Sequence, residues 1–164
     1  MDHWDKGEIE SAIGHVDKIL GNGIFNPNNA GHPLFRAAFV ELLINLRDLM
    51  YKTEKYAARI SFTDDVTVTQ DVKDVTGLIK YVRDALCHPD SDNHYIEKGN
   101  IKATFNVIFR KGTLLKMGEF EQSSPYQDDT CFFFGSQRIL LRRHILRAFD
   151  EAKNKLVPLL KNAN

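Results

Sequence analysis

Apolar residues recur every three or four positions over four long stretches of the chain, which is the spacing of one face of an α-helix. These stretches cover residues 9–20, 33–58, 71–87 and 137–160. Charged and polar residues occupy most positions between the apolar ones, so each predicted helix has one face to bury. Four amphipathic helices that follow one another predict an up-and-down helical bundle.

The residues at the ends of these stretches support the predicted boundaries. Gly21 begins a Gly-Asn-Gly sequence that is typical of a helix C-cap. Pro33 suits the first turn of the second helix. Pro89 ends the third helix, because a proline disfavours the helical conformation at the residue before it. Pro158 lies close to the end of the last helix and is expected to fray or bend it.

The period changes between the third and the fourth helical stretch. Residues 102–109 have the pattern of a β-strand, and residues 114–117 and 131–134 are two shorter extended candidates. No repeat or linker divides the chain. We therefore expect a single, mainly α domain over residues 1–164, with a small β-hairpin-type insertion at about 101–135 before the last helix.

Composition narrows the class of protein. A hydrophobic fraction of 43% and a charged fraction of 27% over 164 residues are ordinary for a soluble globular domain. Cys87 and Cys131 are too few to staple a secreted scaffold, and the acidic N-terminus lacks the apolar segment of a signal peptide. No apolar run approaches the length of a membrane span, so the expected location is the cytoplasm.

The charge of the chain is balanced but unevenly distributed. The 22 Lys and Arg residues match the 22 Asp and Glu residues, which argues against a protein that coats nucleic acid by bulk charge. Residues 98–116 nevertheless carry 5 bases and no acid, and residues 138–155 carry 6 bases and 2 acids. This pattern suits local contact with phosphate or a self-complementary dimer.

The sharpest chemical signal lies at the end of the predicted third helix. It is the hexapeptide Arg83-Asp84-Ala85-Leu86-Cys87-His88. Histidine is suited to moving protons near neutral pH, and the planar fork of arginine matches phosphate oxygens. Asp84 precedes His88 by one helical turn and is expected to orient its imidazole. Such side chains are those needed for metal-free cleavage of RNA by its own 2′-OH.

This hexapeptide resembles the Arg-x4-His signature of the HEPN superfamily, whose members often have Asn or Asp directly after the Arg. The resemblance implies a HEPN-like four-helix bundle over residues 8–88 and 137–160, with the motif at the end of the third main helix. It also implies a metal-independent endoribonuclease without a cofactor, acting as a homodimer in which two motifs face each other. Catalysis would use Arg83, Asp84 and His88.

The resemblance further implies a role as a toxin or host-defence factor, with a protein antitoxin as a candidate partner. In some toxin members a Tyr two residues after the His is modified by a nucleotidyltransferase antitoxin. Asp90 stands at that position in this chain, which argues against that form of regulation.

A structural interpretation of the motif remains open. Arg83 and His88 are cations near the end of a helix, where positive charge is favoured by the helix dipole. The chain would then be a non-catalytic HEPN-like module that dimerises or binds RNA or protein. A nucleotide-binding sensor is a weaker alternative, because the sequence has no Gly-rich phosphate loop.

Two other chemistries near the motif compete with simpler interpretations. Alternating His and Asp residues could ligate a divalent metal, but a solvated polar loop is the favoured interpretation. These residues are His88, Asp90, Asp92 and His94, with Glu97 nearby. Cys87 is adjacent to His88, yet neighbouring helical residues point about 100° apart, so a small buried residue is favoured over a nucleophile.

Basic and aromatic residues late in the chain provide a second candidate for nucleic-acid contact. The basic residues of the predicted last helix are Arg138, Arg142, Arg143, His144 and Arg147, and the four arginines are candidate RNA contacts. The alternative is that Arg142 or His144 points into the bundle and forms an ion pair with an acid such as Asp128 or Asp129. The aromatic run 132–134 could stack on bases, but packing in the core is the favoured expectation.

Overall fold

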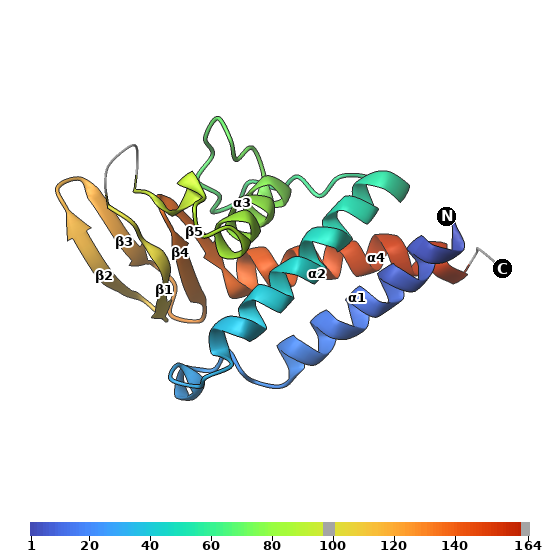
Figure 1. Cartoon of the computed structure of the whole chain (residues 1–164), viewed down its shortest axis with the longest axis horizontal. Coiled ribbons are helices and arrows are strands. Elements are labelled where there is room, and N and C mark those ends of the chain that lie inside the picture. The colour runs from blue at the N-terminus through green and yellow to red at the C-terminus, as the bar shows by residue number, and fades with distance from the viewer. Residues whose placement is uncertain (97–100, 162–164) are drawn as a thin grey trace.

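The computed structural model describes residues 1–96 and 101–161, which form helices at both ends of the sequence and strands between them (Figure 1). The helices are α1 (His3–Gly21), α2 (Phe35–Tyr56), α3 (Val75–Cys87) and α4 (Arg147–Lys161). The strands are β1 (Thr104–Phe109), β2 (Gly112–Met117), β3 (Phe120–Ser124), β4 (Thr130–Phe134) and β5 (Gln137–Leu140). Short helical turns are η1 (Pro27–Asn29), η2 (Asp92–His94) and η3 (Leu141–Leu146), of which η3 is a π-helical turn.

The strands make two antiparallel sheets, so the fold is α+β and the expectation of a mainly α bundle is wrong. One sheet has the order β1-β4-β5, and β2 pairs with β3 in a separate hairpin. Helices α1, α2 and α4 lie side by side, and the three-stranded sheet lies at one end of them with the hairpin beyond it (Figure 1). The start of α1 and the end of α4 lie together at the opposite end.

The largest error in the predicted elements lies at the start of the last helix. Residues 137–140 form β5, which pairs with β4 from Phe134↔Gln137 to Cys131↔Leu140. A π-helical turn follows, and α-helix begins only at Arg147. The apolar residues of β5 continued the helical spacing of α4 in the sequence, which concealed the strand. Strand β3 was also missed, because its sequence is largely polar.

Other predicted elements are confirmed with somewhat different bounds. The strand predictions over 102–109, 114–117 and 131–134 correspond to β1, β2 and β4. Helix α3 begins four residues later than expected, because the Asp74 carboxylate caps it by accepting a hydrogen bond from Gly77 N–H at 2.8 Å. The connection before it is held to the helix start, where Thr76 Oγ1 donates to the Ile60 carbonyl at 2.5 Å.

Strand β4 is buried on both faces and joins the sheet to the helices. Phe132 and Phe134 belong to the core formed with the helices, and the Phe132 ring stacks on Phe39 of α2 with centroids 4.0 Å apart. Cys131 and Phe133 face the other way, into a smaller cluster with Ile108 and other side chains. Burial raises the pKa of the Cys131 thiol to about 12. The three phenylalanines are at most 3% exposed, so they are core residues rather than a platform for bases.

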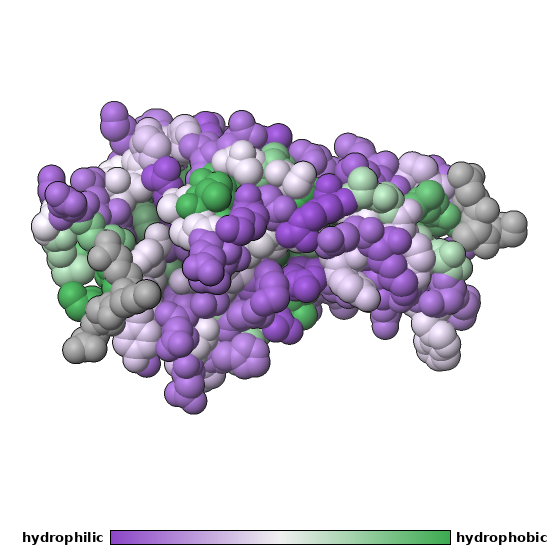
Figure 2. All heavy atoms as spheres, turned by 90° about the horizontal axis from the view of Figure 1, so that it is seen from above, coloured by the Kyte–Doolittle hydropathy of each residue, from purple (hydrophilic) through white to green (hydrophobic). Residues whose placement is uncertain are grey.

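One face of the surface and the described helices can be compared with what a membrane-spanning helix requires. The face seen from above is mostly hydrophilic, and its hydrophobic areas are small and separate (Figure 2). Among the described helices, none combines the length and the apolar character that crossing a bilayer requires.

A buried imidazole holds the connection between α2 and α3 against η3. The His144 side chain is fully buried, and its Nδ1 accepts a hydrogen bond from Leu140 N–H at 3.1 Å. The ring proton is therefore on Nε2, which lies 3.1 Å from the Asp64 carbonyl oxygen and donates to it. Burial lowers the pKa of His144, although the hydrogen bond to Asp64 opposes this effect.

Because Gly135 has no side chain, the β4–β5 turn can pack closely against the backbone of Asn93 and Tyr95. Gly135 has a φ of +53°, and a Cβ there would lie 2.5 Å from the Tyr95 carbonyl oxygen and 2.6 Å from that of Asn93. We expect Gly135→Ala to lower the free energy of unfolding by about 2–3 kcal/mol, measured by urea denaturation. Gly118 has a similar φ of +59° and nothing within 4 Å, so Gly118→Ala is expected to cost only about 1 kcal/mol. Equal losses would contradict the role of the close approach.

The lowered pKa of the buried His144 predicts that the fold loses stability in mild acid. Unfolded His144 takes up a proton as the pH falls through about 6.5, whereas the folded residue resists protonation until a lower pH. The contribution of His144 to the free energy of unfolding is therefore present above pH 6.5 and is lost as the pH falls. We expect the free energy of unfolding to depend less on pH, between about 7.5 and about 5.5, in His144→Asn than in the wild type. Substitution of the exposed His15 by Asn is the control, and an equal effect in both variants would contradict the assignment.

Candidate functional site

The hexapeptide of the motif lies at the C-terminal end of α3. This helix buries Val75, Leu78, Ile79, Val82 and Ala85, and the motif residues Arg83, Asp84 and His88 fall on its other faces. His88 is the C-cap, in an extended conformation, and its N–H donates to the Asp84 carbonyl at 3.0 Å. The expectation that the helix ends before Pro89 is confirmed.

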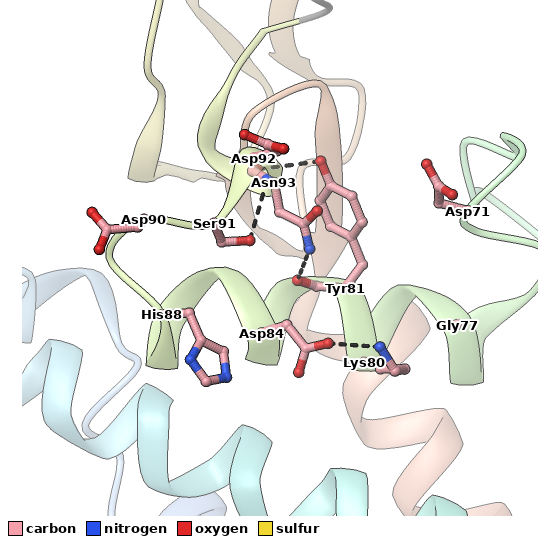
Figure 3. A pocket seen from close by; sticks show the side chains of 10 residues that line it. All are labelled: Asp71, Gly77, Lys80, Tyr81, Asp84, His88, Asp90, Ser91, Asp92 and Asn93. Atoms are coloured by element: carbon pink, nitrogen blue, oxygen red, sulfur yellow. Dashed lines mark hydrogen bonds and ion pairs between the residues drawn. The ribbon is translucent and has the colours of Figure 1, made fainter.

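The exposed His88 lines a polar cleft of about 690 Å³ between α3 and the loop that follows it (Figure 3). Lys80, Tyr81 and Asp84 line the helix side of the cleft. The loop is fixed to the helix because Asn93 Nδ2 donates to the Tyr81 carbonyl at 3.0 Å and Tyr81 Oη donates to the Asn93 carbonyl at 3.2 Å. The cleft thus has one wall made by a helix and a second wall tied to it.

The Asp84 carboxylate pairs with its basic neighbours. Its oxygens lie 2.7 Å from Lys80 Nζ and 3.0 Å from Arg83 Nη1. Burial alone would raise the pKa of Asp84, but these two hydrogen bonds outweigh it and the pKa is lowered, so the group is charged at neutral pH. Figure 3 shows Asp84 turned toward Lys80, and no hydrogen bond joins it to the His88 ring in the part of the chain that the structure describes. Asp84 therefore positions Arg83 rather than His88.

The Arg83 side chain lines a different hollow from the His88 side chain. It lines a depression of about 470 Å³ between α2 and α3, to which Arg47, Asp48 and Tyr51 also contribute. The two motif residues are five positions apart, which on a helix places them about 140° apart around the axis. Asp84 and Lys80 line both hollows, which are therefore neighbours. One copy of the chain consequently does not direct the guanidinium and the imidazole at a single point.

Carboxylates dominate the cleft beside His88. Its lining includes four acids, Asp71, Asp84, Asp90 and Asp92. They do not form a metal centre, because no group of three or more His, Cys, Asp or Glu in residues 1–96 and 101–161 is arranged to hold an ion. Of the residues weighed as metal ligands in the sequence, His94 is buried with Nε2 3.2 Å from the His88 carbonyl, and Glu97 lies outside the described residues.

The four late arginines do not share one helical face, which corrects the expectation that all of them lie on the last helix. Arg138 is on β5, Arg142 and Arg143 are in η3, and Arg147 is the first residue of α4. Arg138 Nη1 donates to the Ser123 carbonyl at 3.3 Å, so it ties β5 to β3.

Arg143 and Arg147 are engaged in contacts within the chain. The Arg143 guanidinium lies 3.6 Å from the centre of the Tyr126 ring, and it pairs with Asp128 and Asp129 at 3.0 Å each. Arg147 lies over Phe62 and pairs with an acid of the α2–α3 connection and one of α4, which are Asp64 and Glu151. The ion pairs with Asp128 and Asp129 that the structure describes are thus made by Arg143, and not by Arg142 or His144, for which the structural alternative was expected.

Three residues near the motif were not singled out from the sequence. Arg47, Tyr51 and Lys80 line the same hollow as Arg83. Arg47 and Tyr51 are four residues apart, so they share a face of α2, and this spacing is visible in the sequence. Which face of α2 is turned toward α3 depends on tertiary packing, and the spacing alone does not give it.

The Asp129 carboxylate organises the start of η3 and predicts a large difference between two neighbouring acids. It is fully buried and accepts hydrogen bonds from Thr130 N, Arg142 N and Arg143 N at 2.8–3.1 Å, besides the pair with Arg143. We expect Asp129→Asn to lower the free energy of unfolding by about 3 kcal/mol, because an amide cannot accept all of these bonds. Thermal and urea denaturation would measure the loss. The adjacent Asp128→Asn is the control, since its side chain is mostly exposed, and a comparable loss there would refute the assignment.

Comparison with known proteins adds no constraint on this site. No protein-family model, curated protein or solved structure matches the chain. The resemblance to the HEPN superfamily therefore rests on residues 83–88 and on their position at the end of the third long helix.

Proposed function

We propose that the chain is a metal-independent endoribonuclease of the HEPN type, active as a homodimer in the cytoplasm. The observation that carries the proposal is the solvent-exposed His88 at the end of α3, on the same helix as an Arg83 that the charged Asp84 holds in place. This arrangement offers a proton-transfer group and a fixed cation on the two sides of one carboxylate. A role as a toxin or host-defence factor, restrained by a protein antitoxin, belongs to the same proposal.

The proposed reaction is transesterification by the substrate's own hydroxyl. The 2′-oxygen of a ribose attacks the adjacent phosphorus as its proton passes to the imidazole of His88. The bond from phosphorus to the 5′-oxygen of the next nucleotide breaks, and that oxygen takes up a proton from the imidazolium that the first transfer creates. Arg83 stabilises the negative charge on the phosphoryl oxygens. The products are a 2′,3′-cyclic phosphate and a 5′-hydroxyl, and the balance needs neither a metal nor an oxidant.

The geometry favours a site made by two copies of the chain. Within one copy, Arg83 and His88 line separate hollows on either side of Asp84. Two copies related by a two-fold axis can place the Arg83 of one beside the His88 of the other, so that both act on one phosphate. The cation also offsets the four carboxylates near His88, which by themselves would repel a phosphate.

A second candidate is a module that binds RNA or protein without cutting it. The observation that favours it is the pairing of Arg83 with Asp84, which is also shared with Lys80. An arginine committed to a carboxylate of its own helix has a structural role as a helix-end cation. The two candidates differ in one measurable respect, which is the cleavage of RNA.

We expect the purified chain to cleave RNA in the presence of EDTA and to leave 2′,3′-cyclic phosphate ends. His88→Ala is expected to slow cleavage about 100-fold or more, because it removes the proton-transfer group. Substitution of the exposed His32 by Ala is the control and is expected to retain the activity. Rates are measured by gel electrophoresis of end-labelled RNA, with a substrate that carries a single 2′-deoxy position as a second control.

Three outcomes would overturn the ribonuclease proposal. These are the absence of EDTA-resistant cleavage, cleavage that survives His88→Ala, and cleavage at a position that lacks the 2′-hydroxyl. The first of these outcomes, together with retained binding of RNA, would support the non-catalytic module instead.

A further inference from the structure

The depression between α2 and α3 combines positive charge with an exposed aromatic ring. It has a volume of about 470 Å³ and lies on the Arg83 side of Asp84. Its lining residues are Ile44, Arg47, Asp48, Tyr51, Lys80, Arg83 and Asp84. We propose that this hollow, referred to below as the α2–α3 hollow, binds the phosphate and the base of an unpaired nucleotide of single-stranded RNA. The inference rests on the proposed function, since the strand would run from the motif into the hollow.

The two helices present the required side chains by their spacing. On α2, Ile44, Arg47 and Tyr51 are separated by three and four residues, so they form one stripe. On α3, Lys80 and Arg83 are three residues apart and form the facing stripe. The packing of α2 against α3 therefore gathers three cations and one aromatic ring around one depression.

Arg47 is the cation that is available to a ligand. It is half-buried, lies 6.0 Å from the centre of the Tyr51 ring, and forms no ion pair with a carboxylate in the described part of the chain. By contrast, Lys80 is paired with Asp84, and Arg83 gives one terminal nitrogen to the same carboxylate. A phosphate placed between Arg47 and Arg83 would meet two guanidinium groups, which match phosphate oxygens well.

The charges in the hollow favour an anion. Three cations, Arg47, Lys80 and Arg83, face two carboxylates, Asp48 and Asp84. Burial raises the pKa of Asp48, although the nearby Lys52 opposes this effect, so its negative charge is the less favoured of the two. This excess of positive charge contrasts with the cleft beside His88, where carboxylates predominate. A phosphate is thus accommodated on the Arg83 side of the motif.

Tyr51 supplies the second element of nucleotide recognition. It is 51% exposed, although it belongs to a helix whose opposite face is fully buried. An exposed aromatic ring next to arginine is the arrangement on which unpaired bases stack. The faces of a base inside a duplex are covered by stacking on its neighbours, so the hollow selects single-stranded RNA over a duplex. Two such hollows would not pack directly against each other, because their cations would repel one another unless an anion lay between them.

Binding of a fluorescein-labelled single-stranded RNA, measured by anisotropy, tests the proposal in the full chain. All proteins carry His88→Ala, so that cleavage does not interfere with the measurement. We expect Arg47→Ala to weaken binding about tenfold and to reduce the slope of log K against log salt by about 0.7, the value for one lost phosphate contact on a single strand. Tyr51→Ala is expected to weaken binding about tenfold, and Tyr51→Phe is expected to restore it.

Arg36→Ala is the matched control, because it removes an exposed arginine from the same helix about three turns away and is expected to leave affinity unchanged. If Arg47→Ala unfolds the chain, Arg47→Gln replaces it. Unchanged affinity and salt slope in the Arg47 and Tyr51 variants would overturn the proposal. So would a change in self-association, measured by sedimentation, without a change in RNA affinity, since the hollow would then contact a second copy.

The test separates this inference from the ribonuclease proposal. If the wild type cleaves RNA but the Arg47 and Tyr51 variants bind RNA normally, the proposal that the α2–α3 hollow binds RNA is wrong, and the ribonuclease proposal is retained. If the wild type does not cleave RNA but binding depends on Arg47 and Tyr51, the ribonuclease is wrong and the hollow is the RNA site of a binding module.

Discussion

The structure depends on the burial of β4 on both faces. Phe132 and Phe134 pack on the helices and Phe133 packs on the opposite side, so the strand cannot be removed without opening two clusters of the core. Because a strand in this position needs hydrogen-bonding partners along both edges, β1 and β5 must flank it. The chain between α3 and α4 is for this reason part of the core, rather than an insertion on a helical bundle.

The spacing of apolar and polar residues predicted many of the helices and strands. It failed where tertiary contacts determine the boundary of an element. The apolar spacing located α2, α3 and most of α1, the strand-like pattern of 102–109 located β1, and the apolar run 131–134 located β4. The apolar spacing did not separate β5 from α4, since Ile139 and Leu140 satisfy both a buried strand and the continuation of a helix. The sharp boundary comes from Asp129, whose carboxylate caps η3 from ten residues or more away along the chain. A contact of that range leaves no periodic signal.

The candidate site shows the same division. The motif and its place at the end of α3 could be predicted, because Pro89 fixes the end of the helix and helical spacing relates Arg83 to Asp84. The residue that pairs with Asp84 could not be predicted. Lys80 and His88 are both four residues from Asp84, so both are within its reach on a helix. His88, as the C-cap, has left the helical conformation, whereas Lys80 remains within it. The division into an acidic cleft and a basic hollow likewise depends on which elements pack on each side of α3.

The Gly135 turn, far from the motif in sequence, lies against the loop that forms one wall of the His88 cleft. Its N–H bonds to the Ala103 carbonyl at 2.7 Å, while the carbonyls of Asn93 and Tyr95 close over its bare Cα. The same Asn93 is fastened to Tyr81 on α3. The loop that forms this wall is therefore held on one side by the β4–β5 turn and on the other by α3. The width of the cleft depends on the positions of both elements. A small shift of the β4–β5 turn would therefore change the space beside His88.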